Sequence, residues 1–378
     1  MQHVIFDDST NMIITRKIQI AIIGTPEERQ SGFDKLYKHI NAAYKIANMT
    51  ASHLFMLDNT TPYLSDEDRE NLTFLGCKGQ KATKQNAPYV VASELYKGEV
   101  DMSMVCCLQQ KVNKEYQDDR KKGLYNRTVR SYKSNLPIPF KSSQFRLSKS
   151  IHITDDGDER ENINFTLIGI QFAMIFGRDR SGNRVIVERV MDGTYKMATS
   201  SIQSDGKKLF LYLCVDIPKE KVKLTEGKRL YATLGVMNPI ICSTTDKFAR
   251  VWEVGTKEEF YYRRRQIQEA VRRCQEANRY TVGGKGRKRK CQALDRFHDK
   301  EKHYVDTKLH TYSRLLIDLA IKHKCSELVL MRQTEREEIA KEENQKGEPL
   351  VLRNWSYYGL KDKIKYKAER VGIKLITL

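Results

Sequence analysis

Alternating and helical runs of apolar residues divide the first part of the chain into strands and one helical insertion. Ile18, Ile20 and Ile22 alternate with more polar neighbours and predict a first strand. The segment 25–28, TPEE, has the form of a helix start with a capping box and a proline in the first turn. A further helical stretch is predicted at about 90–122. The apolar face predicted for the first helix consists of Phe33, Leu36, Tyr37, Ile40, Tyr44 and Ala47.

From Asn164 to Pro218 the pattern changes to short β-branched and aromatic runs separated by glycine-containing turns. Strands are predicted at Phe165–Phe176, Val185–Val190 and Leu209–Ile217, and residues 150–163 are predicted to form an acidic loop. Together with the first strand, these runs could close a small barrel that carries the helical segment as an insertion.

Three short strands with tight turns follow, at about Leu230–Val236, Ile240–Thr244 and Phe248–Glu253. A strongly basic helix, a long helix, a buried-type strand at Leu328–Met331, another helix and a last strand at Ile373–Leu378 complete the pattern. Three antiparallel strands, followed by helices that alternate with parallel strands, are typical of an RNase H-like α/β core. The sequence therefore predicts an α+β multidomain protein.

The charge of the chain points to a polyanionic partner. Lys and Arg number 67 against 48 Asp and Glu, which gives a net charge of +19 and a pI of about 9.4. Nucleic acid is the polyanion that such a surplus favours, and a merely soluble basic protein is the alternative. No apolar run approaches the ~20 residues of a spanning helix, so a membrane partner is not expected. The N-terminus lacks the features of a signal peptide.

The cysteines favour a reducing compartment. The eight of them form no CxxC pair, so a zinc knuckle or ribbon is not expected. Most lie in apolar settings, where a free cysteine behaves as a small hydrophobic residue. We therefore expect a cytoplasmic protein, in a bacterial cell associated with the nucleoid.

Two stretches concentrate the cationic candidates for nucleic-acid binding. The first, between 263 and 290, holds eleven Lys and Arg residues against two Glu, with a GGKG loop expected at 283–286. Such a surface can follow a phosphate backbone without reading bases; a localisation signal or a solvated face is the alternative. These residues are Arg263, Arg264, Arg265, Arg272, Arg273, Arg279, Lys285, Arg287, Lys288, Arg289 and Lys290.

The second stretch interleaves cations with aromatic rings, including Tyr125 and Tyr132, which suits phosphate contact and base stacking. A solvated linker face is the alternative there. Its candidate residues are Lys121, Lys122, Arg127, Arg130 and Lys133.

Several motifs carry a family resemblance. The segment Arg263–Arg273, the GGKGRKRK loop and the helix with Asp306, His310 and Ser313 resemble TnpB-type transposon proteins. So does the later segment NWSYYGL, at 354–360. VDIPKE at 215–220 and LGVMNPIICS at 234–243 are similar to the miniature type V-F CRISPR effectors.

This resemblance implies a β-barrel wedge domain with an inserted helical recognition lobe, followed by a RuvC-type domain. The implied boundaries are 1–24 for the first wedge strand, 25–135 for the recognition lobe, 136–225 for the wedge barrel and 226–378 for the RuvC-like domain. It also implies that a guide RNA is bound and that DNA is found by pairing with it.

The chain departs from the family where a RuvC-type site needs carboxylates for magnesium. The Asp of the family pattern GIDxGxxxP aligns with Thr233, and the second carboxylate aligns with Met331. A hydroxyl carries no charge and a thioether is a soft ligand, so neither suits magnesium. The third acidic motif and the zinc-binding part lie beyond the last residue of the sequence. Neighbouring acids are interpreted as solvated surface: Asp246, Glu335, Glu337 and Glu338.

From these losses the sequence predicts a protein that is not an enzyme and binds neither catalytic magnesium nor zinc. The predicted function is a nuclease-dead, RNA-guided DNA-binding protein that forms an R-loop and regulates transcription. Its expected partners are a guide RNA, target double-stranded DNA, a sigma factor with RNA polymerase, and a second copy of itself. Three alternatives stay open: repression by promoter occlusion, an active RNA-guided endonuclease with relocated acidic residues, and a plain RNA- or DNA-binding protein.

Overall fold

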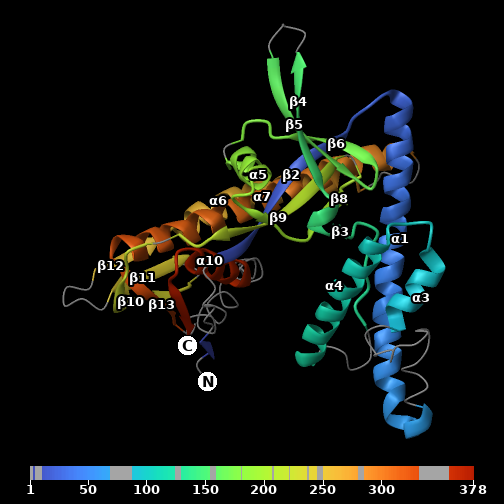
Figure 1. Ribbon diagram of the computed structural model, residues 1–378. Coiled ribbons are helices and arrows are strands. Elements are labelled where there is room, and N and C mark those ends of the chain that lie inside the picture. The colour runs from blue at the N-terminus through green and yellow to red at the C-terminus, as the bar shows by residue number, and fades with distance from the viewer. Residues whose placement is uncertain are drawn as a thin grey trace. The chain divides into compact units, whose positions relative to one another are not determined.

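The protein, seen here as a computed structural model, divides into two compact units (Figure 1). The N-terminal unit is Ile13–Ile217, and the C-terminal unit joins Met1–Met12 to Pro218–Leu378. The wedge, lobe and RuvC-like boundaries implied above stay predictions. The structure describes residues 3–4, 11–68, 87–123, 129–153, 159–179, 181–206, 208–220, 222–235, 238–244, 250–279, 285–331 and 357–378.

The N-terminal unit is built on an eight-stranded sheet in the order β3-β8-β9-β2-β6-β5-β4, with β7 paired to β9. Strand β9 shows why these segments form strands, since every second residue from Leu209 to Ile217 is buried. The rings of Phe165 and Phe172 stack at 4.9 Å in the same core. The strands are β2 (Asn11–Ile22), β3 (Ile138–Phe140), β4 (Arg146–Ile153), β5 (Glu159–Leu167), β6 (Ile170–Ile175), β7 (Lys196–Met197), β8 (Ser200–Ser204) and β9 (Leu209–Pro218).

Helix α1 (Pro26–Thr60) starts as the sequence predicted. The Thr25 hydroxyl accepts the Glu28 N–H, and the Glu28 carboxylate accepts the Thr25 N–H at 2.8 Å. The predicted apolar face is partly wrong, because Phe33 and Tyr37 are 40% and 61% exposed. The buried stripe uses smaller residues, which let helix α4 approach closely: Leu36, Ala43, Ile46, Ala47, Ala51 and Leu54.

Two further helices pack beside α1 in the same unit, α3 (Ala87–Tyr96) and α4 (Met102–Lys121) (Figure 1). Short 3₁₀ turns η1 (Thr61–Tyr63) and η2 (Ser142–Gln144) flank the helical region. Mixed helix and sheet in this unit confirm the predicted fold class at that level.

Two local predictions are wrong. The β-branched run Val185–Val190 lies in a helix, α5 (Asn183–Met191), because Gly182 adopts φ +67° and the Asp179 carboxylate accepts the Arg184 N–H at 2.7 Å. These contacts start a helix that β-branched composition disfavours only weakly. The predicted acidic loop at 150–163 is instead largely a hairpin, since β4 pairs with β5 and stands out from the sheet (Figure 1).

A buried histidine joins three parts of the N-terminal unit. His39 on α1 is 3% exposed, and its Nδ1–H donates to the Lys35 carbonyl at 2.8 Å. Its Nε2 accepts the Asp101 backbone N–H at 3.2 Å, just before α4. The Asp101 carboxylate in turn accepts from the Met104 N–H and from the side chain of Gln144 in η2. A neutral imidazole is therefore part of this junction.

The C-terminal unit contains a six-stranded sheet in the order β1-β14-β13-β10-β11-β12. Strands β10, β11 and β12 pair antiparallel, whereas β10, β13 and β14 pair parallel, which is the alternation that the sequence predicted. The strands are β1 (His3–Val4), β10 (Thr225–Thr233), β11 (Ile240–Thr244), β12 (Val251–Val254), β13 (Cys325–Leu330) and β14 (Lys374–Thr377), and the helices are α6 (Lys257–Ala277), α7 (Lys285–Lys322) and α10 (Tyr357–Arg370).

One face of this sheet carries the core of the unit. Leu230 of β10 and Leu328 of β13 are register partners with no exposed surface, and they pack with Leu316 of α7 and Ile364 of α10. Helices α7 and α10 therefore cover the same face of the sheet.

The turn before α6 needs Gly255, since φ is +79° and a Cβ there would lie 2.6 Å from the ring of Tyr312.

None of the described helices is both long enough and apolar enough to cross a membrane.

Lowering the pH should destabilise the N-terminal unit through His39. Burial lowers the pKa of His39 below its usual value of 6.5, so the unfolded chain takes up a proton at a higher pH than the folded chain does. The contribution of His39 to the free energy of unfolding is then fully present above pH 6.5 and decreases as the pH drops below that value. Calorimetric melting of wild type and His39→Gln from pH 5 to 8 should show a weaker pH dependence in the variant.

The exposed histidine His298 supplies the control. His298→Gln should keep the wild-type pH dependence. An unchanged slope in His39→Gln would contradict the role given to the buried ring.

Candidate nucleic-acid interface

Helix α6 presents a row of arginines to solvent. Arg265, Arg272 and Arg273 are exposed on one side of the helix and form this row, and Arg263 is exposed on a different side. Two of them have acidic neighbours one turn on, at 3.4 Å from Arg265 to Glu269 and at 3.8 Å from Arg272 to Glu276. Exposed pairs of this kind contribute little stability and exchange easily for other anions. The row can therefore follow a phosphate backbone.

Arg264 does not belong to that row. Its spacing from Phe260 and Ile267 places it on the buried face of α6, where it is 7% exposed. Its guanidinium donates to Glu301 of α7 at 2.9 Å and 3.0 Å, and Gln268 donates to the same oxygen at 3.2 Å. The prediction that Arg264 contacts nucleic acid is corrected by this burial, because the residue joins α6 to α7.

The remaining cations of the first stretch lie just after α6 and in the first turns of α7. Arg279 is exposed in the turn after α6. Lys285 and residues 287–290 form the first turns of α7, so the predicted loop does not extend through Lys285 and Gly286. The two glycines before them lie outside the described residues. Placing Lys285, Arg287, Lys288, Arg289 and Lys290 on a helix fixes their backbone spacing at 1.5 Å per residue.

In the N-terminal unit the second stretch has a mixed role. Lys121, Lys122 and Lys133 are exposed, and Arg127 lies outside the described residues. Arg130 binds both Asp119 oxygens at 2.8 Å, and these hydrogen bonds raise its pKa. It is therefore engaged within the protein.

Tyr132 in the same stretch is not available for base stacking. It is 8% exposed, and its hydroxyl donates to Glu115 at 2.7 Å. Its backbone N–H and carbonyl both bond to the Asn48 side chain, at 2.7 Å and 2.8 Å. The ring expected to stack on a base instead fixes the returning chain to α1.

The two positions that the family resemblance assigned to carboxylates meet at the carboxyl ends of two central strands, β10 and β13. Ala232 pairs with Leu330 in parallel register, and the Met331 N–H donates to the Ala232 carbonyl at 2.9 Å. Thr233 and Met331 are the next residues of these strands, so they lie side by side at the carboxyl ends. Open α/β sheets bind ligands at the carboxyl ends of their strands.

The side chains at these strand ends do not fit a pair of magnesium ions. Thr233 offers a neutral hydroxyl and Met331, 39% exposed, offers a thioether. Within the described ranges, no three His, Cys, Asp or Glu side chains lie close enough to hold a metal ion. Any carboxylates for such a site would come from elsewhere, and the four nearby acids named above, from Asp246 to Glu338, lie outside the described residues.

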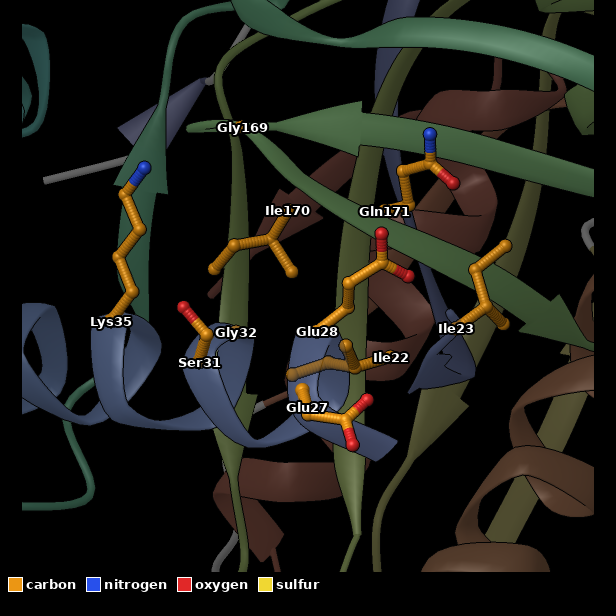
Figure 2. A pocket seen from close by; sticks show the side chains of 10 residues that line it. All are labelled: Ile22, Ile23, Glu27, Glu28, Ser31, Gly32, Lys35, Gly169, Ile170 and Gln171. Atoms are coloured by element: carbon orange, nitrogen blue, oxygen red, sulfur yellow. The ribbon is translucent and has the colours of Figure 1, made fainter. Parts of the chain in front are cut away.

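A groove of about 500 Å³ lies beside the start of α1 in the N-terminal unit (Figure 2). Gly32 lets the helix approach the sheet, since a Cβ there would lie 3.1 Å from Ile22 and 3.2 Å from Ile170. Glu27 and Glu28 line the groove, and Figure 2 shows both carboxylates beside it. Two acidic groups disfavour a phosphate, so we do not assign the groove to nucleic acid.

Comparison with known proteins supports the family resemblance. The chain is 26% identical over 280 residues to the CRISPR-associated endodeoxyribonuclease Cas12f1 of Sulfoacidibacillus thermotolerans, covering 70% of this chain and 62% of that protein. It is 26% identical over 221 residues to the Cas12f1 of Syntrophomonas palmitatica, covering 55% and 42%. The chain thus spans less than two thirds of the length of these relatives. No protein-family profile matches it.

A solved structure shows the same fold. The Cas12f1 chain in a cryo-EM complex with sgRNA and target DNA superposes with a TM-score of 0.67 at 14% identity, covering 97% of this chain and 89% of that one. The resemblance to miniature type V-F effectors is confirmed by these comparisons. A Cas12f-like fold of mixed helix and sheet is confirmed as well.

One prediction is contradicted. The sequence predicted that the chain is not an enzyme, because Thr233 and Met331 replace acidic residues. Both curated relatives are named endodeoxyribonucleases, which are enzymes, so that conclusion does not stand. The prediction assumed that only the carboxylate positions known from the family can supply the acidic groups of a nuclease site.

Breaking the buried ion pair between α6 and α7 should destabilise the C-terminal unit. Arg264→Met leaves the partly buried Glu301 carboxylate with the hydrogen bond from Gln268 but without its charged partner, which costs about 2 kcal/mol. Chemical denaturation followed by circular dichroism measures the loss.

The neighbouring exposed arginine gives the matched control. Arg265→Met should change the free energy of unfolding by less than about 0.5 kcal/mol while weakening binding to nucleic acid. Equal stability losses in the two variants would contradict the division of roles along α6.

Proposed function

We propose that this chain is an RNA-guided DNA-binding effector. In this proposal it binds a guide RNA, and the guide pairs with complementary DNA to form an R-loop of ~20 base pairs or fewer. The observation that carries the proposal is the exposed arginine row of α6 on a chain with a Cas12f-like fold. Such a row contacts backbone phosphates, and base pairing supplies the sequence specificity that arginines facing phosphates lack.

We further propose that guided binding leads to DNA cleavage, because both curated relatives are named for that activity. The strand ends of β10 and β13 present a hydroxyl and a thioether, so this chain would need acids at relocated positions. In the sequence, Glu335 follows β13 and Asp246 follows β11, and both are acids that the notion of relocated ligands can draw on. The described residues do not themselves fit a magnesium ion.

Regulation of transcription stays a prediction alongside these proposals. A protein held at a chosen DNA site can block a promoter or bring a sigma factor and RNA polymerase to it. A homodimer on one guide RNA and a cytoplasmic, nucleoid-associated location are likewise predictions. Separate measurements of binding and of cleavage would reveal occupancy without cutting.

Binding should depend on complementarity to the guide. The protein, copurified with its RNA, should bind matched double-stranded DNA at least about 100-fold more tightly than a scrambled duplex of the same composition, because mismatches oppose R-loop formation. Electrophoretic mobility shift at fixed salt measures both affinities. Equal affinities would identify a plain nucleic-acid-binding protein and reject the guided mechanism.

Cleavage should require relocated acids. In a magnesium-containing buffer, the RNA-loaded protein should cut matched DNA, and Asp246→Ala or Glu335→Ala should slow cutting by about two orders of magnitude through loss of an acidic group that cleavage needs. Glu258→Ala, an exposed acid in the first turn of α6, is the control and should cut normally. Wild-type protein that binds matched DNA without cutting it would reject the cleavage proposal and leave the binding proposal intact.

A further inference from the structure

The seam between α7 and α10 gathers charged side chains that the arginine row of α6 does not include. On α7, Asp306, His310 and Arg314 recur one turn apart and share a ridge. On α10, Lys363 and Lys367 are also one turn apart and face that ridge. The two helices pack against each other within the C-terminal unit. The seam therefore brings three cations and a histidine together.

Two of these cations have carboxylate partners. The Lys363 ammonium lies 2.7 Å from an Asp306 oxygen and 3.1 Å from His310 Nε2. Arg314 lies 3.2 Å from Asp318, one turn further along α7. Burial, followed by the charges of Lys363 and Lys367, lowers the pKa of His310, so its ring is neutral near pH 7 and accepts from Lys363.

Lys367 has a different environment. Its ammonium donates to the Ser313 hydroxyl at 2.8 Å and to the His310 carbonyl at 2.5 Å, and both acceptors are neutral. No carboxylate in the described part of the chain lies within 4.0 Å of it. The charged groups that face it are Arg314 and Asp318 on α7 and Lys363 on its own helix. Lys367 is a half-buried cation between two other cations.

This arrangement favours an anion. A half-buried ammonium without a carboxylate loses hydration and gains only neutral acceptors. Burial first, and then the charges of Arg314 and Lys363, lower the pKa of Lys367 to about 8. An anion placed beside Lys367 and Arg314 would offset both costs, because it attracts the ammonium and the guanidinium and screens their mutual repulsion.

We propose that Lys367, with Arg314 and Lys363 beside it, binds one phosphodiester group of a bound nucleic-acid strand. The seam thus extends the cationic surface of the C-terminal unit beyond α6. This inference rests on the proposed function, since both require a nucleic-acid partner. Asp306, His310 and Ser313, which carry part of the family resemblance, acquire a role here: they fix the two lysines in place.

The site should have its own pH dependence. Lys367 is protonated below pH 8 and loses its proton as the pH rises through 8, so affinity for phosphate should fall over that interval. The arginines of α6 keep their charge throughout, because guanidinium stays protonated at these pH values. A fall in affinity between pH 7 and 9 therefore separates the seam from the arginine row.

The test uses the full chain, freed of copurified RNA, and a labelled 12-nucleotide single-stranded RNA of unrelated sequence. Fluorescence anisotropy gives the affinity between pH 7 and 9 and between low and high salt. Lys367→Met should weaken binding about fivefold at pH 7 and flatten the pH dependence, and it should lower the salt slope by about 0.7, the value for one phosphate contact on a single strand.

Lys365→Met is the matched control, because Lys365 is exposed on the same helix and the charge change is identical. It should leave the pH dependence at the wild-type midpoint. If Lys367→Met does not fold, Arg314→Gln serves instead: removing one repelling cation should move the midpoint of the pH dependence upward. Melting curves of each variant separate loss of fold from loss of binding.

Two results would overturn the proposal: Lys367→Met and Lys365→Met weaken binding equally, or Lys367→Met keeps the wild-type pH dependence. Repeating the assay with DNA of the same sequence distinguishes the source of the phosphate. Loss with RNA alone assigns the site to the guide, and loss with both assigns it to the backbone common to the two. Because the probe is unrelated to any guide, the result does not depend on the complementarity test above.

Discussion

The parallel pairing of β10 with β13 is the contact on which the C-terminal unit depends. It joins segments almost 100 residues apart, so its formation must offset the entropy of closing a long loop. Burial of Leu230 against Leu328 supplies apolar area on one face. On the other face Arg229 donates to Glu327 at 2.6 Å, and Lys374 of β14 lies 3.8 Å from the same carboxylate. Contacts on both faces of the sheet therefore stabilise the same register between β10 and β13.

That register decides what the strand ends present. A slip by one residue would move every side chain of β10 to the opposite face. In the observed register Ala232 faces the core, and Thr233 lies beside Met331 at the carboxyl ends of β10 and β13. A hydroxyl and a thioether thus occupy the place where the resemblance led us to expect carboxylates. The fold is shared with a solved Cas12f1 chain, yet the fold alone does not determine which side chains stand at the strand ends.

Cations occupy three kinds of environment in this protein, and their hydrogen-bond partners distinguish them. Arg264 and Arg130 are bound to carboxylates that hold helices or returning segments in place. The arginines on the outer side of α6 have at most weak, exposed partners. Lys367 is intermediate, since it is half-buried and has only neutral acceptors. Net charge by itself does not distinguish these three situations, although all of them contribute to the surplus.

The sequence by itself determined the elements whose signals are local. The capping box at Thr25, the order of strands and helices after Pro218, and the cationic stretch on α6 all follow from spacing and composition within a few turns of chain. Tertiary structure decided which side of each element is covered. It buried Arg264 but not Arg265, and it turned Val185–Val190 into a helix through the turn at Gly182 and the hydrogen bond from the Arg184 N–H to the Asp179 carboxylate. It also placed Lys367 against His310 and Ser313, because contacts between residues more than 50 positions apart leave no periodic trace in the sequence.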